Sequence, residues 1–160
     1  MLERDEVKIA VTCRAFPHTP IANPVWMFQD WECGIKEEKL AARVQAARDE
    51  GAGLAVLLSH NGFEVDRQLA GRVPGIDVIL TGHTHDALPR PAQIGRTLLI
   101  ATGACGKFIT GLILMCRAGG WPDIVMPSFP FSEKRLRPMP TWPLWCAACA
   151  NPMQRIWPAS

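Results

Sequence analysis

The chain has 160 residues, of which 48% are hydrophobic and 20% charged, and its formal net charge is +2. This length suits one domain with one hydrophobic core, and this composition is ordinary for a globular protein. The near-neutral charge does not point to nucleic acid, and no apolar run reaches the roughly 18 residues of a membrane-spanning helix. We therefore expect neither nucleic acid nor a membrane as a partner.

The first third of the chain predicts a strand, a loop and a helix. Its start, MLERDEVKIAV, lacks the basic beginning and apolar core of a signal peptide, so the chain as written is expected to stay in the cytoplasm. The β-branched run over 6–13 predicts a buried strand. Residues 15–34 hold three prolines and two tryptophans without a period, which predicts a long ordered loop. From residue 35 the apolar spacing is helical, and Gly51 is the expected end of that helix.

The middle of the chain alternates apolar runs with a short helical stretch. The runs over 54–58 and 76–80 are typical of strands covered on both faces, and 65–70 predicts one or two helical turns. Two further strands are expected over 97–102 and 108–114. This order predicts an α/β layered domain with at least some parallel strand pairs.

Residues 116–160 differ in composition from the rest of the chain. They hold eight of the fourteen prolines, four of the six tryptophans and three of the six cysteines. Prolines at this density exclude long helices and central strands. We therefore divide the chain into a domain over 1–115 and a Pro/Trp-rich tail over 116–160. The single C-x-x-C, Cys146 and Cys149, lacks the second pair that a zinc ribbon needs, so free thiols in a reducing compartment are favoured.

Histidine motifs follow both of the central apolar runs. His60 comes after the run 54–58, whereas His83 and His85 come after the run 76–80. Ligands bind at the carboxyl ends of strands in layered α/β domains, so both motifs should lie on one functional rim. Two histidines spaced two apart point the same way on an extended backbone, and imidazole is a common metal ligand. The three rings could bind one metal ion, or parts of two.

Each of these residues also has a plainer interpretation. A single histidine after a strand is usually a surface residue. His60 is predicted to be a metal ligand because the tandem histidine motif follows the neighbouring run. His18 stands between loop residues and is expected to have no functional role. Asp86 could orient a histidine or be a plain surface residue, and we assign Asn61 the same supporting role. Lys107 follows a glycine, but the other residues of a phosphate-binding loop are missing. The predicted metal ligands are His60, His83 and His85, with Asn61 and Asp86 as supporting residues and no catalytic residue assigned.

The motifs LLSHNG and DVILTGHTHD resemble two histidine blocks of the calcineurin-like metallophosphoesterases. Together with AFPHTPIANP and TLLIATGACGKF, they resemble one branch closely, the thiosulfohydrolases of bacterial sulfur oxidation, which are related to the periplasmic 5′-nucleotidases. The resemblance covers about residues 6–114. AFPHTPIANP is the segment that favours the thiosulfohydrolases over the nucleotidases.

This resemblance implies a fold, cofactors and a partner. The fold is part of a four-layer αββα sandwich, and the intact family holds two divalent metal ions, most often manganese. By the motif match, His60 and His83 would ligate one ion and His85 the other. The thiosulfohydrolases are periplasmic and release sulfate from a cysteine S-thiosulfonate on a carrier protein.

The chain also departs from the family pattern. The family's Asp-x-His motif, bridging Asp and Asn-His pair do not occur in this sequence. We therefore expect residues 1–115 to be the C-terminal part of a metallophosphoesterase domain that binds at most one ion, weakly, and is inactive alone. A bare sheet edge is expected beside the first strand. The alternatives are a 5′-nucleotidase-like phosphohydrolase and a non-catalytic metal-binding fragment.

The tail has a specific interpretation. Back-translated from Met139 and read from the third base of each codon, it can encode a helix-forming segment that resembles the one following the metal domain in the family. We therefore predict that residues 116–160 are frameshifted and poorly structured.

Overall fold

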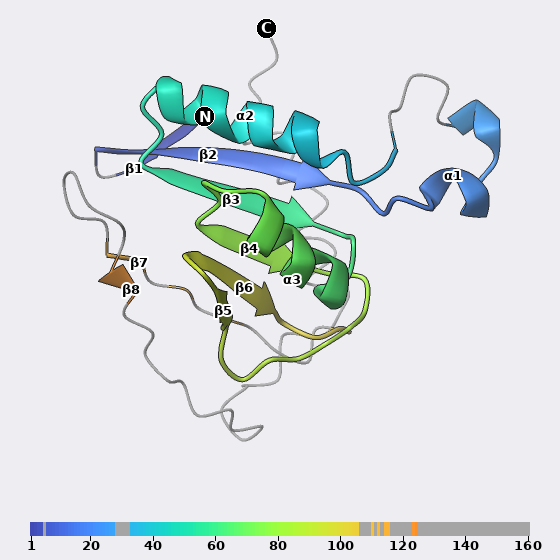
Figure 1. Ribbon diagram of the computed structural model, residues 1–160. Helices are drawn as coiled ribbons and strands as arrows, with labels where there is room; N and C mark the ends of the chain where they lie inside the picture. The colour runs from blue at the N-terminus through green and yellow to red at the C-terminus, as the bar shows by residue number, and fades with distance from the viewer. Residues whose placement is uncertain are drawn as a thin grey trace, which may run out of the picture. The chain divides into compact units, whose positions relative to one another are not determined.

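Figure 1 shows the computed structural model, in which Met1–Ser128 is the first of two units. The residues that the structure describes are 1–4, 6–27, 33–105, 110, 112, 114–115 and 123–124.

Six strands form one mixed sheet in the order β1-β2-β3-β4-β6-β5. The pairs β2–β3, β3–β4 and β4–β6 are parallel, whereas β1–β2 and β5–β6 are antiparallel hairpins at the two edges. The predicted α/β class and the predicted parallel pairing are therefore confirmed. The strands are β1 Leu2–Arg4, β2 Val7–Arg14, β3 Leu54–Ser59, β4 Val78–Thr81, β5 Ala92–Ile94 and β6 Thr97–Ala101.

Two longer helices cross the sheet, and shorter elements lie outside it. The predicted helix over 35–50 is α2, and the short helical stretch over 65–70 extends to three turns as α3. Gly51 ends α2 as predicted, because its φ of 89° is a left-handed conformation that glycine adopts without strain. The helices are α1 Thr19–Ala22, a 3-10 turn Val25–Met27, α2 Glu37–Asp49 and α3 Phe63–Arg72; the short strands β7 Leu114–Met115 and β8 Asp123–Ile124 pair with each other.

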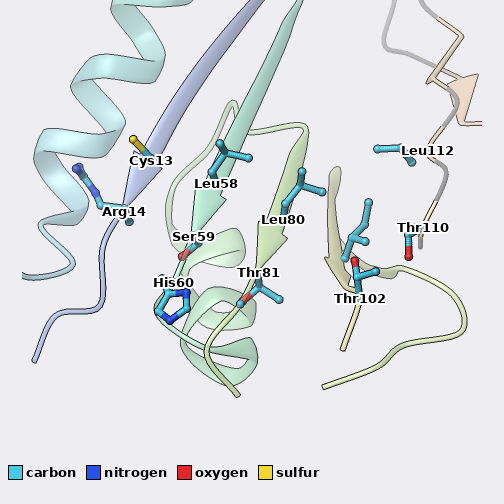
Figure 2. A pocket seen from close by; sticks show the side chains of 12 residues that line it. Cys13, Arg14, Leu58, Ser59, His60, Leu80, Thr81, Thr102, Thr110 and Leu112 are labelled. Atoms are coloured by element: carbon cyan, nitrogen blue, oxygen red, sulfur yellow. The ribbon is translucent and has the colours of Figure 1, made fainter. Parts of the chain in front are cut away.

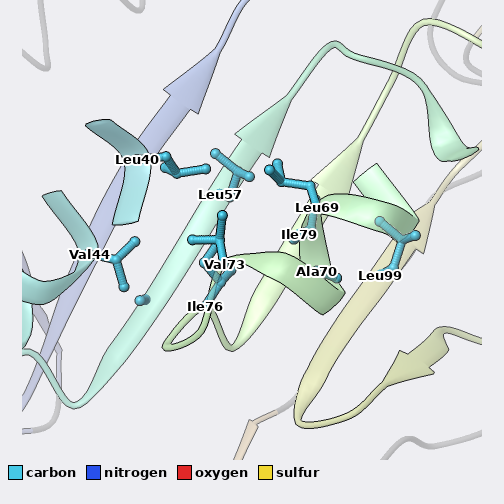
Figure 3. Packing of buried hydrophobic residues seen from close by; sticks show 10 residues of the cluster. Leu40, Val44, Leu57, Leu69, Ala70, Val73, Ile76, Ile79 and Leu99 are labelled. Atoms are coloured by element: carbon cyan, nitrogen blue, oxygen red, sulfur yellow. The ribbon is translucent and has the colours of Figure 1, made fainter. Parts of the chain in front are cut away.

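The helices α2 and α3 cover the same face of the sheet and form the core with it (Figure 3). Leu40 of α2 and Leu69 of α3 are at most 1% exposed, and they pack with Leu57, Ile79 and Leu99 from the three central strands. Because side chains alternate between the two faces of a strand, the strand residues next to these buried side chains point to the opposite face of the sheet. This burial of leucine and isoleucine stabilises the parallel sheet.

The opposite face of the sheet is apolar and partly open. Val11, Leu58 and Leu80 point to this side from three adjacent strands, and they remain 44%, 43% and 38% exposed. One sheet with one helical layer is the part of the αββα sandwich that the described residues form.

The structure corrects the sequence prediction at the edges of the sheet. β1 and β5 were not predicted, because three-residue strands are too short to show alternation. β1 pairs with β2, so β2 is not the bare edge that was expected; the outermost strand carries Glu3 and Arg4, charges that disfavour edge-to-edge pairing. Most of the predicted strand 108–114 and the tail 116–160, apart from β8, lie outside the described residues. No helix among the described residues is long and apolar enough to cross a membrane.

Candidate metal centre

The two histidine motifs lie side by side at the carboxyl ends of β3 and β4. Ser59 is in register with Thr81, so the next residues of the two strands, His60 and Gly82, are neighbours. The Gly82 N–H donates to the Ser59 carbonyl at 2.9 Å, which extends the ladder beyond the last strand residues. The predicted common rim is therefore observed.

The rings of His60 and His83 form a close pair. Their centroids are 5.3 Å apart and their planes meet at 67°. An imidazole nitrogen binds a zinc-like ion at about 2.0–2.1 Å, so two rings on one tetrahedral ion have centroids about 5 Å apart. The spacing of the pair therefore fits two ligands of a single divalent ion. Both side chains are exposed at the rim.

Two glycines leave the space that this pair occupies. A Cβ atom on Gly82 would lie 3.1 Å from the His60 Nδ1 atom, closer than most real Cβ contacts. On Gly62, whose φ is 99°, a Cβ atom would lie 2.9 Å from the Thr84 Cγ2 atom. The close approach of the two loops therefore requires glycine at position 62, whereas a methyl group at position 82 would displace the His60 ring by a few tenths of an ångström.

The backbone of the second motif is curled and not extended. His83 and His85 have φ angles of 82° and 59°, in the left-handed region that side chains other than glycine rarely adopt. The expectation that an extended backbone points both rings the same way is therefore wrong. The motif follows β4 in a tight loop, and such strained positions cluster at functional sites.

The structure does not bring His85 into a set with the other two histidines. Within the described ranges, no group of three His, Cys, Asp or Glu side chains is close enough to hold a metal ion. His85 is exposed at the same rim. Its role as a ligand stays a prediction, and the residues present fit two ligands of one ion.

Phe16 lies beside the histidine pair, a position that no feature of the sequence predicts. Its ring stacks on His83 with centroids 4.0 Å apart and an interplanar angle of 26°. It also meets the His18 ring edge-on, with centroids 5.4 Å apart and an interplanar angle of 70°. Phe16 thus holds the His83 ring against the loop that follows β2. His18 itself is exposed, and no spacing to another histidine marks it as a ligand.

Asp66 is a buried carboxylate behind the two loops. Its Oδ1 atom accepts hydrogen bonds from the Ser59 hydroxyl at 2.7 Å and from the Asn61 side-chain amide at 3.0 Å. Its Oδ2 atom accepts a short hydrogen bond from the Thr81 hydroxyl. The residue lies in the first turn of α3 and is 0% exposed. No signal in the sequence separated it from the other charged residues of that helix.

The two predicted supporting residues contact the loops and not the imidazoles. Asn61 is buried and bonds Asp66, and its Oδ1 atom has no hydrogen-bond partner among the described residues. Asp86 accepts a short bond from the Thr84 hydroxyl, which in turn accepts the Phe63 N–H at 3.1 Å. Both residues therefore shape the loops that carry the histidines, and their effect on a metal stays a prediction.

A cavity of about 530 Å³ lies next to His60 on the open face of the sheet (Figure 2). Leu58 and Leu80 project into it from adjacent strands, while His60 lies beyond the end of β3 at its polar margin. Arg14, at the end of β2, also lines it, and its Nε and Nη2 atoms are buried without an acceptor among the described residues. Burial, with a smaller effect of the nearby Arg43 charge, lowers the pKa of the Arg14 guanidinium.

The chain is similar to parts of two longer proteins, although no family model matches it. The uncharacterized metallophosphoesterase YunD of Bacillus subtilis is 32% identical over 107 residues, which are 66% of this chain and 22% of that protein. The structure of the sulfate thiohydrolase SoxB of Thermus thermophilus in complex with glycerol superposes with a TM-score of 0.59. It is 40% identical, over 66% of this chain and 19% of that one.

The chain therefore spans about a fifth of the length of each of these relatives. Both similarities indicate the metallophosphoesterase superfamily of hydrolases, whose name implies divalent metal ions.

Proposed function

We propose that this chain carries part of the metal site of a dinuclear hydrolase of the thiosulfohydrolase type. The proposed substrate is a cysteine S-thiosulfonate on a carrier protein in the periplasm, and the proposed product is sulfate. The observation that carries this proposal is the His60–His83 pair, 5.3 Å apart at the ends of two adjacent parallel strands. The 40% identity to SoxB supports the choice of this branch.

We assign each histidine of the site to one of two metal ions. His60 and His83 would hold one ion, His85 would hold the second, and we propose manganese for both. When bound, such ions lower the pKa of a bound water and stabilise negative charge on the substrate. Phe16 keeps the His83 ring in place by stacking, so the ring does not rotate away from the rim. The open cavity beside His60 gives a bulky substrate access to this margin.

We further propose that the 160-residue chain alone binds at most one ion, weakly, and has no turnover. A pair of neutral imidazoles can hold a single ion, whereas two adjacent cations need bridging anionic ligands. Among the described residues no carboxylate joins the histidine pair in a ligand group. This observation also keeps a second candidate open, a metal-binding module without catalysis.

Metal titration of the full chain tests the assignment of the ligands. We expect one Mn²⁺ or Zn²⁺ ion to bind by calorimetry, and His60→Ala or His83→Ala to weaken binding at least about tenfold. His85→Ala should have a smaller effect. His18→Ala is the matched control, because it removes an exposed imidazole that contacts Phe16 and is not a proposed ligand. Equal effects of all four variants would contradict the assignment.

Turnover tests the proposed substrate. We expect the chain alone to hydrolyse neither a peptide carrying cysteine S-thiosulfonate nor a nucleoside monophosphate. Joined to the remaining part of the metal domain of a relative, it should release sulfate from the peptide. Phosphate release from the nucleotide alone would favour the 5′-nucleotidase-like alternative. Binding of one ion without either reaction in the joined protein would favour the non-catalytic module.

A further inference from the structure

We propose that Asp66 is the positioning residue that brings the His60 and His83 loops together, a role that rests on the metal site proposed above. One carboxylate oxygen accepts hydrogen bonds from the residues beside His60, and the other accepts one from the strand end before His83. Oδ1 accepts bonds from Ser59 and Asn61, the residues on either side of His60. Oδ2 accepts the bond from Thr81, which ends β4 two residues before His83. One side chain is thereby attached to both histidine loops.

The burial of Asp66 shows that this arrangement is not a surface feature. A carboxylate is stable in a protein interior only when hydrogen bonds or a cation compensate for lost water. Asp66 is 0% exposed, and in the described part of the chain its side chain meets two hydroxyls and an amide but no Lys or Arg. All the compensation therefore comes from residues that belong to the two loops.

Helix capping does not account for the position of Asp66. An acidic residue in the first turn of a helix is favourable through the helix dipole, but Glu64 of α3 occupies that turn while exposed to solvent. The bonds that the Asp66 oxygens accept come from the side chains of Ser59, Asn61 and Thr81, and none of these is a backbone N–H of α3. Their bonds leave the helix and reach the ends of β3 and β4.

The strain of the second loop explains why such an attachment is needed. His83 adopts a φ of 82°, which a free loop would relax. The Thr81 hydroxyl bond to Asp66 and the Gly82 N–H bond to Ser59 hold the chain on the strand side of that residue. Without the carboxylate, the Gly82 N–H bond to Ser59 and the Phe63 N–H bond to Thr84 would still join the two loops, but neither involves a side chain behind both histidines.

Thr81→Val tests the proposal with the smallest change, because valine has the shape of threonine without the hydroxyl. The matched control is Thr97→Val, which removes another buried hydroxyl bond, from Thr97 to the Ile76 carbonyl at 2.7 Å, far from the histidines. The first readout is the nuclear Overhauser effect between the His60 and His83 ring protons in metal-free protein. The chain has four histidines, so these signals can be assigned. The second readout is Zn²⁺ affinity.

We expect Thr81→Val to lose the ring–ring signal and to bind Zn²⁺ about tenfold more weakly, whereas Thr97→Val keeps both. If Thr81→Val does not fold, Asp66→Asn, compared with Asp77→Asn, replaces it and should show the same contrast. An unchanged ring–ring signal in the Asp66 or Thr81 variant, or an equal loss in its control, would overturn the proposal. Normal ring–ring behaviour in a chain that binds no Zn²⁺ would reject the proposed metal site but not the role of Asp66.

Discussion

Two buried carboxylates lie at opposite ends of the same parallel strands. Asp77, 3% exposed, precedes β4, accepts the Ala55 N–H at 2.6 Å and forms an ion pair with Arg48 at 2.6 Å. Asp66 lies behind the carboxyl ends of β3 and β4 and accepts neutral donors from both loops. Both side chains therefore connect neighbouring elements, but only one of them has a cationic partner.

This difference agrees with the proposed roles, in which the amino end stabilises the fold and the carboxyl end binds a metal ion. At the amino end Arg48 also donates to the Gly75 and Ala52 carbonyls, so the guanidinium bonds both the buried carboxylate and nearby backbone groups. At the carboxyl end, the loop after Thr81 carries His83 and His85, whose side chains are exposed and whose φ angles are left-handed. Strained backbone positions cluster at functional sites, which supports the metal site proposed at this end.

The largest expected effect is the loss of stability in Asp77→Ala. The variant leaves the Ala55 N–H without its acceptor and Arg48 without its anion, so we expect unfolding free energy to fall by about 2–4 kcal/mol. Urea unfolding measures this. The ring–ring signal of His60 and His83 should persist under folding conditions, and its loss would mean that the two ends are not separable.

An exposed ion pair with the same separation provides the control. Arg67 and Glu64 also approach to 2.6 Å, but their side chains are 50% and 60% exposed. Because water screens such a pair, Arg67→Met should lower the free energy of unfolding far less than Asp77→Ala does. An equal effect of Asp77→Ala and Arg67→Met would contradict the role of burial.

A smaller and more local effect is expected from Gly82→Ala. The new Cβ atom would lie 3.1 Å from the His60 Nδ1 atom, so the ring should move and metal affinity should drop a few-fold. The control is Gly71→Ala in α3, where the Cβ atom would meet nothing closer than 4.0 Å. Alanine is the better helix former, so this variant should be more stable by about 0.5 kcal/mol. Unchanged His60 chemical shifts in Gly82→Ala would contradict the close packing of the two loops.

The smallest effect is a pH dependence on the surface of α3. Hydrogen bonds from Arg67 and Gln68 lower the pKa of Glu64 to about 2 from the model-peptide value of 4.5. Because the folded pKa is the lower one, the ionised carboxylate stabilises the fold above about pH 4.5, and this contribution is lost as the pH falls towards 2. At pH 7 the urea midpoint of Glu64→Gln should therefore be slightly lower than that of the parent chain. At pH 3 the difference between the two midpoints should be smaller. A difference that grows on acidification would contradict this sign.

Much of the central fold could be predicted from the sequence, because its signals are local. Continuous apolar runs predicted β3, β4 and β6, and helical spacing with a terminal glycine predicted α2. The position of the histidines at the strand ends followed from the same runs. The edge strands were missed since three residues show no period, although Gly95, with a φ of 58°, is a turn signal between β5 and β6.

The sequence by itself determined the α/β class, the parallel strands and the rim on which His60 and His83 lie. Only the tertiary structure decided that these two rings pair, that Phe16 stacks on one of them and that Asp66 connects their loops. The reason is physical: strand and helix periods are set by neighbours along the chain, whereas a buried carboxylate or a stacked ring depends on partners brought close by packing. Asp66 and Thr81 are 15 residues apart in sequence and meet only because α3 packs on the parallel strands.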